Sequence, residues 1–179
     1  FAYDDRYRIR DLFFPYVGQY NNLGPLGVRL GFYADGALSW LHDDSWSVSC
    51  TASTTGSSQL VGEWLLENQA LSLCVVATDF MATEGSVLHR QLRIRNTRGD
   101  CREVKLFSTQ QTHIRETDIG DTALFDPSSS SMIHYKGNIY LAFGAPDITQ
   151  YAAGISGFAG LDGTYRDAED GVLSNVPIA

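Results

Sequence analysis

The sequence predicts an all-β protein built from antiparallel sheets. Short runs rich in Val, Ile, Leu and aromatic residues follow one another along the chain, with turn residues between them and no sustained helical periodicity. Two of the connections have the residues that are typical of hairpin turns. Strands spaced about 8 to 15 residues apart in this way favour two antiparallel sheets packed face to face, as in a β-sandwich.

Two hairpins are expected. The first joins Val28 to Ala34 with Ala37 to Leu41 through Asp35-Gly36, a pair that readily adopts the positive φ angles of a tight turn. The second joins Met132 to Tyr135 with Ile139 to Phe143 through a three-residue loop that has a glycine at its centre. Each hairpin places two consecutive runs side by side in one sheet.

Five longer runs between the hairpins are expected to be strands of a large sheet. They are Trp46 to Ala52, Leu60 to Glu67, Leu71 to Phe80, Val87 to Asn96 and Glu103 to Ile114. In the fourth, one face carries Leu88, Leu92 and Ile94, so it is expected to meet a core. The other face is polar and carries His89, Gln91, Arg93 and Arg95. The fifth ends in Ser108 to Thr112, which is polar on both faces. Such a stretch belongs at a sheet edge or in a wet groove.

Length, composition and charge limit the class of protein. The 179 residues, of which 44% are hydrophobic, are enough for one globular domain with a sizeable core. A net charge of −8 repels phosphate groups and anionic lipid surfaces. No apolar run approaches the roughly 20 residues of a membrane span. We therefore expect neither nucleic acid nor a membrane as partner.

The three cysteines indicate a reducing compartment. Cys50, Cys74 and Cys101 are odd in number and have no CxxC spacing, so the sequence predicts neither a disulfide framework nor a zinc site. This favours the cytoplasm over secretion. Because the first residue is Phe1, the sequence is also compatible with a removed leader.

No catalytic or cofactor motif stands out. His113, Asp118, Asp121 and Asp126 are donors suited to a divalent metal, but their spacing matches no ligand pattern. An acidic cluster could supply the paired carboxylates of a glycosidase, yet it lies in a Gly-rich charged segment without an apolar pocket that would raise a pKa. The members of that cluster are Asp162, Asp167, Glu169 and Asp170. We therefore expect no catalytic residue, no metal and no cofactor in this chain.

Three segments in a fixed order carry a family resemblance. They are Arg8 to Gln19, Asp118 to Ala123 together with His134 to Gly137, and Gly163 to Gly171. Together they resemble the amino-terminal β-sandwich domain of prokaryotic glucoamylase-like enzymes of glycoside hydrolase family 15, a group that includes bacterial trehalases. The likeness covers nearly the whole chain.

The resemblance implies an antiparallel two-sheet super-sandwich, similar to galactose-mutarotase-type domains. Residues 1–179 would form a single N-terminal domain with both ends clipped, ahead of an α/α toroid that holds both catalytic glutamates. The parent enzyme would be inverting and would act on maltooligosaccharides, isomalto-oligosaccharides or trehalose. The expected partners are this toroid, in the same parent chain, and α-glucoside saccharides.

The resemblance also directs attention to two groups of residues. Aromatic rings and amides suit contacts to a sugar or a partner domain, and the candidates are Tyr16, Gln19, Tyr20, Asn21 and Asn22. An alternative is that the two tyrosines plug the end of the sandwich. Candidates for ion pairs that hold loops in place are Arg10, Asp11, Arg166, Asp167 and Asp170. The alternative here is ordinary surface pairing.

Two other functions remain open. An independent carbohydrate-binding module would use exposed aromatic residues such as Trp40, Trp46 or Trp64. An epimerase of the mutarotase type would need a histidine and a carboxylate in one pocket. Its histidine candidates are His89, His113 and His134.

Overall fold

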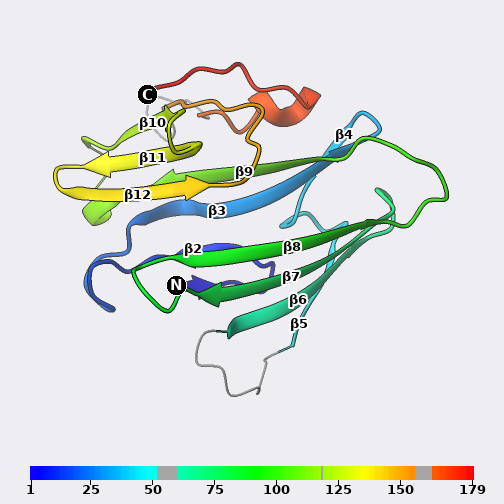
Figure 1. Ribbon diagram of the computed structural model, residues 1–179, viewed down its shortest axis with the longest axis horizontal. Coiled ribbons are helices and arrows are strands. Elements are labelled where there is room, and N and C mark those ends of the chain that lie inside the picture. The colour runs from blue at the N-terminus through cyan, green and yellow to red at the C-terminus, as the bar shows by residue number, and fades with distance from the viewer. Residues whose placement is uncertain (52–59, 118, 156–162) are drawn as a thin grey trace.

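The protein is an antiparallel β structure, as predicted. The computed structural model describes residues 1–51, 60–117, 119–155 and 163–179. Within them, every paired strand runs antiparallel to its neighbour, and the only helical elements are two 3-10 turns (Figure 1). None of the helical segments in this part of the chain is long or apolar enough to cross a membrane.

The central layer is a five-stranded sheet. Its strands are β1 (Ala2–Tyr3), β2 (Ile9–Asp11), β3 (Leu23–Ala34) and β4 (Ala37–Trp40), in that order, with β9 (Lys105–Thr112) paired to the free side of β3. The predicted hairpin through Asp35-Gly36 is confirmed, because both turn residues have positive φ and Ala34 pairs with Ala37.

A four-stranded sheet forms a second layer. It contains β5 (Ser47–Thr51), β6 (Leu60–Asn68), β7 (Leu73–Met81) and β8 (Leu88–Asn96) in chain order. The strand predicted from Trp46 to Ala52 is β5, and its last predicted residue, Ala52, lies outside the described residues. The strand predicted from Leu71 begins at Leu73, because Ser72 has a positive φ of 50° and remains in the turn.

A third, smaller sheet is present in addition to these two. It consists of β10 (Thr122–Asp126), β11 (Ser131–Lys136) and β12 (Ile139–Gly144), and Ile178, the penultimate residue, pairs with Leu124 at its edge. The hairpin between β11 and β12 is confirmed, but with a two-residue loop, since Lys136 pairs with Ile139.

The chain leaves the central sheet at the 3-10 turn η1 (Ile114–Glu116), which explains the separate third sheet. Arg115 and Glu116 both have positive φ, and Ile114 is fully buried and fixes the turn against the core. The predicted strand to Ile114 therefore ends at Thr112. A second 3-10 turn, η2 (Asp167–Asp170), lies near the C-terminus.

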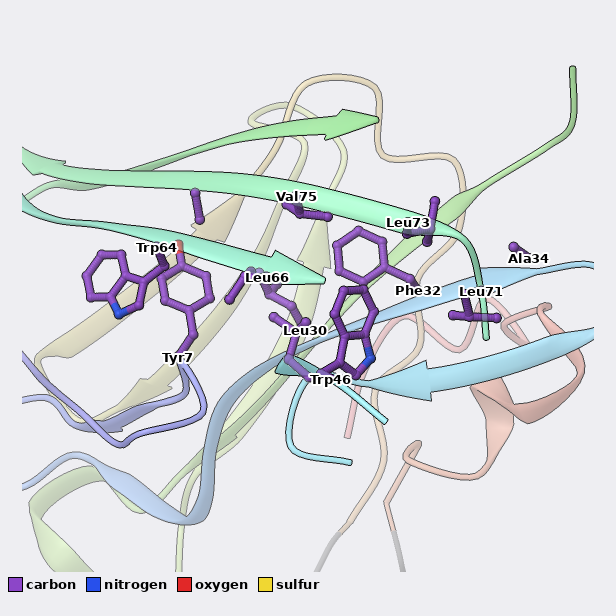
Figure 2. Close-up of a cluster of buried hydrophobic side chains, with 12 residues drawn as sticks. Tyr7, Leu30, Phe32, Ala34, Trp46, Trp64, Leu66, Leu71, Leu73 and Val75 are labelled. Atoms are coloured by element: carbon purple, nitrogen blue, oxygen red, sulfur yellow. The ribbon is translucent and has the colours of Figure 1, made fainter. Parts of the chain in front are cut away.

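The main core lies between the central and four-stranded sheets. Leu30 and Phe32 from β3 pack against Leu66 and Val75 from β6 and β7, and the Phe32 ring centre lies 5.2 Å from that of Trp46 (Figure 2). These side chains are almost fully removed from water. Each buried aliphatic or aromatic side chain of this kind contributes about 1.5 to 3 kcal/mol of transfer free energy.

Two further clusters cover the rest of the central sheet. Val28 meets Ile139 and Leu141 of the three-stranded sheet, and on the opposite face Trp40 and Phe107 meet Ala168 of the C-terminal segment. β3 is therefore covered on both sides over much of its length. This explains why its sequence is apolar at consecutive positions rather than at alternate ones.

Candidate functional site

A groove lies between β9 of the central sheet and β10 and β11 of the third sheet. It encloses about 150 Å³. Its wall on one side is residues 109–113, and on the other it is residues 121–123 with His134. Leu26, residues 154–155, residues 163–165 and Ala179 close the remaining sides. We call this feature the polar groove.

The polar groove is formed by the stretch of β9 that the sequence marked as polar on both faces. Thr109 to Thr112 are all half-buried, and β9 is paired only to β3 among the described strands, so it is an edge strand facing a groove. Gln111 is anchored there because its Oε1 accepts a hydrogen bond from the Leu26 amide at 2.8 Å. Gly24 leaves room for this side chain, since a Cβ at Gly24 would lie 2.8 Å from it.

His134 lies at the inner wall of the polar groove. The side chain comes from β11 and is 93% removed from solvent, with its Nδ1 3.2 Å from the hydroxyl of Thr112 and its ring edge-on to Phe143. Burial lowers the pKa of His134 to about 4, against a smaller opposing effect of Asp121, so the ring is neutral at pH 7. Its Nε2 is buried and has no hydrogen-bond partner among the described residues.

Asp121 is the carboxylate of the polar groove, and the fold neutralises it. One oxygen lies 3.0 Å from Lys136 Nζ, and the other accepts the Ile114 amide at 2.8 Å. Lys136 is itself held by the backbone carbonyl and hydroxyl of Thr117. A histidine and a carboxylate thus line one pocket, as an epimerase requires, but this carboxylate is engaged by a cation and a backbone amide.

Tyr165 marks the other end of the polar groove. Its ring stacks on Trp40 with centres 5.0 Å apart, and the Arg29 guanidinium lies 4.7 Å from the Tyr165 ring centre. Arg29 also lies 3.3 Å from Nε2 of His42. Burial lowers the pKa of both Arg29 and His42. These contacts attach the C-terminal segment to the central sheet and hold residues 163–165 at the groove.

The exposed part of the predicted contact loop lies apart from the polar groove. Tyr16 and Tyr20 are 66% and 45% exposed, Gln19 is exposed, and Val17 between them is 90% exposed. The two tyrosines therefore do not plug the end of the sandwich, which was the alternative reading. They form an outward-facing aromatic loop.

Asn21 and Asn22 hold this loop from inside. Asn22 is fully buried; its amide nitrogen lies within hydrogen-bond distance of three backbone carbonyls, and its oxygen accepts the Arg115 amide. Asn21 Oδ1 accepts the amides of Leu12 and Leu23. Both side chains thus satisfy backbone groups of the loop, which fixes where Tyr20 lies.

The predicted ion-pair residues occupy two places. Arg10 and Asp11 pair with each other at 2.7 Å on the surface, and Asp11 also accepts a hydrogen bond from the side-chain Nδ2 of Asn21 at 2.8 Å. Hydrogen bonding to Asp11 raises the pKa of Arg10. Arg10 and Asp11 therefore form an ordinary surface ion pair, although Asp11 also holds the loop through its hydrogen bond with Asn21.

The other three candidates lie at η2. Asp167 accepts both the amide and the hydroxyl of Ser174 at 2.8 Å, and Asp170 accepts the Val172 amide at 2.9 Å. Arg166 is exposed and begins the turn as its N-cap residue. The two carboxylates therefore fold the segment after η2 by binding backbone groups.

The tryptophans correct one expectation. Trp40, Trp46 and Trp64 are 5%, 2% and 6% exposed, so none of them offers a face to a sugar. The sequence of β6 indicated that Trp64 is buried, because side chains alternate between the two faces of a strand and Trp64 shares its face with Leu66. Of the four residues considered as metal donors, Asp118 lies outside the described residues, and those residues contain no group of three or more His, Cys, Asp or Glu that could hold a metal ion.

Sequence reasoning missed a buried polar cluster at the edge of the main core. Asp79 of β7 is fully buried and accepts hydrogen bonds from the hydroxyls of Tyr3 and Tyr7, and it pairs with Arg90 of β8. The available signal was a lone aspartate in an apolar strand and an arginine on the leucine-bearing side of the next strand.

Comparison with family models, with curated proteins and with solved structures gives no match for this chain.

Proposed function

We propose that this chain is a non-catalytic β-sandwich domain of a glucoamylase-like α-glucoside hydrolase of glycoside hydrolase family 15. In this proposal it packs against the α/α toroid of its parent chain and supports that catalytic domain and its substrate entrance. The parent enzyme would be inverting and would cleave maltooligosaccharides, isomalto-oligosaccharides or trehalose. The all-β antiparallel architecture supports the proposal, because it is the architecture that the resemblance implies.

The observation that carries the proposal is the aromatic loop. Tyr16, Val17 and Tyr20 expose large apolar side chains within five consecutive residues. Single exposed apolar residues are ordinary, but a cluster on a well-braced loop is typical of a surface that a partner covers. Aromatic side chains on a fixed backbone also lose little conformational entropy on docking.

The first test concerns catalysis. The 179-residue chain is incubated with maltose, isomaltose and trehalose, and released glucose is measured. We expect none above buffer, and turnover at enzyme-like rates would contradict the proposal. Mutarotation of glucose is followed in the same samples by polarimetry, because an increase in its rate would favour the epimerase over the accessory domain.

The second test concerns the partner. The reading frame downstream of Ala179 is translated, and we expect a long α-helical segment in the same parent chain. In that intact chain, the amides of Gly18 to Tyr20 should exchange hydrogen more slowly than in the 179-residue chain. A parent chain carrying Tyr16→Ser and Tyr20→Ser should lose the protection, and one carrying Tyr140→Ser, which alters an exposed tyrosine on β12, should keep it. Unchanged exchange in the intact chain would overturn the proposal.

An independent carbohydrate-binding module is the second candidate. The three tryptophans are buried, so they cannot provide the exposed aromatic faces that such a module would use. The polar groove favours this candidate instead, because hydroxyl and amide groups lie there beside the neutral imidazole of His134. A saccharide that binds the 179-residue chain, combined with a downstream frame that encodes no α-helical domain, would favour this candidate.

A further inference from the structure

We propose that the polar groove is a binding site for one ring of an uncharged sugar. The proposal goes beyond the accessory function and does not depend on it, since it concerns side chains of this chain alone. It rests on the charge of the groove, on its hydrogen-bonding groups and on its volume.

The charge of the groove favours a neutral ligand. Asp121 is compensated by Lys136 at 3.0 Å and by the Ile114 amide at 2.8 Å. Lys136 is in turn bound to Thr117 and is therefore already engaged on both sides, so it does not serve as a counter-ion for an anionic ligand. The buried imidazole of His134 is neutral at pH 7. A charged ligand would lose its hydration here without gaining a compensating ion pair.

The hydrogen-bonding groups favour hydroxyls on that ligand. Thr109, Thr112 and Thr122 line the groove with hydroxyl groups that both donate and accept, and the side-chain amide of Gln110 lies at the same wall. Nε2 of His134 has no hydrogen-bond partner among the described residues. A buried nitrogen without a hydrogen bond costs free energy, because it has lost its contact with water. A ligand atom that forms a hydrogen bond with this nitrogen would offset that cost.

A hydroxyl is the group that suits His134 in either tautomer. The contact between Nδ1 and the Thr112 hydroxyl is compatible with a proton on either ring nitrogen, so Nε2 is a donor in one case and an acceptor in the other. A sugar hydroxyl both donates and accepts, whereas a carboxylate only accepts and an ammonium only donates.

The volume sets the size of the ligand. About 150 Å³ is less than the roughly 300 to 1,000 Å³ of pockets for drug-sized molecules. It is also several times the roughly 30 Å³ that one water molecule occupies in the liquid. One sugar ring fits this range, and Leu26, Ala123 and Ile155 supply apolar wall for its C–H groups.

A second cluster with unpartnered buried nitrogens lies beside a pocket that is too small for a ligand. Arg29 Nε and His42 Nδ1 are both buried without a hydrogen-bond partner among the described residues. The pocket beside them, lined by Arg6, Arg8 and Leu41 as well, has no space for even a water-sized ligand. The polar groove combines an unpartnered buried nitrogen with room for a ligand.

The test uses the whole 179-residue chain, labelled with ¹⁵N, and titrates it with methyl α-glucoside, maltose and glucuronate while amide spectra are recorded. We expect saturable shifts for the two neutral sugars, centred on the amides of Thr109 to His113 and Thr122 to Ala123. Glucuronate, the same ring with a carboxylate, should bind at least about tenfold more weakly because none of the described residues that line the groove is a lysine or an arginine. The same affinities are measured by calorimetry.

Two groove variants and a matched control complete the design. Thr112→Val and Thr109→Val keep the side-chain shape and remove one hydroxyl, and each should weaken binding about five- to tenfold while the circular dichroism spectrum stays unchanged. Thr97→Val, at an exposed position after β8, should leave the affinity unchanged.

Three outcomes would overturn the proposal. The first is no saturable shift with either neutral sugar, which would mean that the groove holds water only. The second is a shift map centred on Tyr16 to Tyr20, and the third is unaltered affinity in both groove variants. Each of these leaves the accessory function standing, since that function is judged by glucose release and by the protection of the aromatic loop.

Discussion

Arg90 and Asp79 form an ion pair inside the molecule, with Arg90 Nε 3.1 Å from Asp79 Oδ2. The Asp79 side chain is fully buried and that of Arg90 is 15% exposed. The same carboxylate accepts the hydroxyls of Tyr3 and Tyr7, and the Arg90 guanidinium lies 4.2 Å from the Tyr7 ring centre. Through these contacts the N-terminal segment is fastened to β7 and β8.

Asp79→Asn should lower the free energy of unfolding by about 3 to 5 kcal/mol, because it leaves the buried charge of Arg90 without its counter-ion. The measurement is urea unfolding followed by tryptophan fluorescence. Asp100→Asn is the control: Asp100 pairs with Arg98 at 2.8 Å on the surface, and its loss should cost less than about 1 kcal/mol. Equal losses in the two variants would contradict this account of the interior pair.

The two tyrosines of this cluster predict sensitivity to alkaline pH. Burial raises the pKa of Tyr3 and Tyr7 above the ordinary 10.0, and Asp79 raises both further while Arg90 opposes it. Since the folded pKa is higher than the unfolded one, the stabilisation is complete below pH 10 and is lost as the pH rises beyond it.

The free energy of unfolding should therefore fall above about pH 10, by up to about 1.4 kcal/mol per pH unit for each tyrosine. Urea titrations at increasing pH measure this slope. Tyr7→Phe should make the slope shallower, and Tyr140→Phe, which alters an exposed ring, should not. The same steep fall in the Tyr7→Phe variant would assign the alkaline sensitivity to other groups.

The local parts of the fold were predictable because the residues that decide them are adjacent in sequence. Asp35-Gly36 specifies a hairpin through its own backbone preferences, and the structure has that hairpin. The polar run from Ser108 to Thr112 likewise indicated a groove, because a strand with no apolar face cannot cover a core. Each of these inferences needed fewer than ten consecutive residues.

The long-range parts were not predictable from one sequence. The polar groove joins Thr112 to His134, Asp121 and Tyr165, and nothing in their spacing says that four separate segments meet. The third sheet depends on the left-handed backbone conformation of Arg115 and on the pairing of Leu124 with Ile178. Both result from the way the whole chain packs, which overrides local preference.

His134 predicts a loss of stability in mild acid. Burial lowers the pKa of this side chain from 6.5 to about 4, and Asp121, which faces it in the groove, only partly offsets the effect. The unfolded chain therefore binds a proton between about pH 6.5 and 4 that the folded chain does not. The stabilisation is present above pH 6.5 and is lost as the pH falls towards 4.

Over this interval His134 should account for up to about 3 kcal/mol of the free energy of unfolding. His42 contributes in the same direction, because burial lowers its pKa too. Urea unfolding between pH 4 and 7 measures the sum, and His134→Gln should remove the larger share. His89→Gln, at an exposed position, is the control. An unchanged pH dependence in His134→Gln would show that the folded protein admits the charged imidazole.

Gly27 and Gly36 separate the cost of an unusual backbone angle from that of a steric clash. Both have positive φ, of 61° and 83°, where an L side chain is disfavoured by about 1 to 2 kcal/mol. A Cβ at Gly36 would meet none of the described atoms within 4 Å, whereas one at Gly27 would lie 2.3 Å from the carbonyl oxygen of Ile9 in β2. Gly27→Ala must therefore move two backbones apart, and Gly36→Ala need not.

Gly27→Ala should accordingly lower the free energy of unfolding by at least about 1 kcal/mol more than Gly36→Ala does. Its effect should also reach the polar groove, because the neighbouring Leu26 amide donates to Gln111 at 2.8 Å. Hydrogen exchange of the Leu26 amide measures this directly and should be faster in Gly27→Ala only. If the two variants are equally stable and the Leu26 amide stays protected in both, the approach of β2 to β3 at this point is looser than the structure has it.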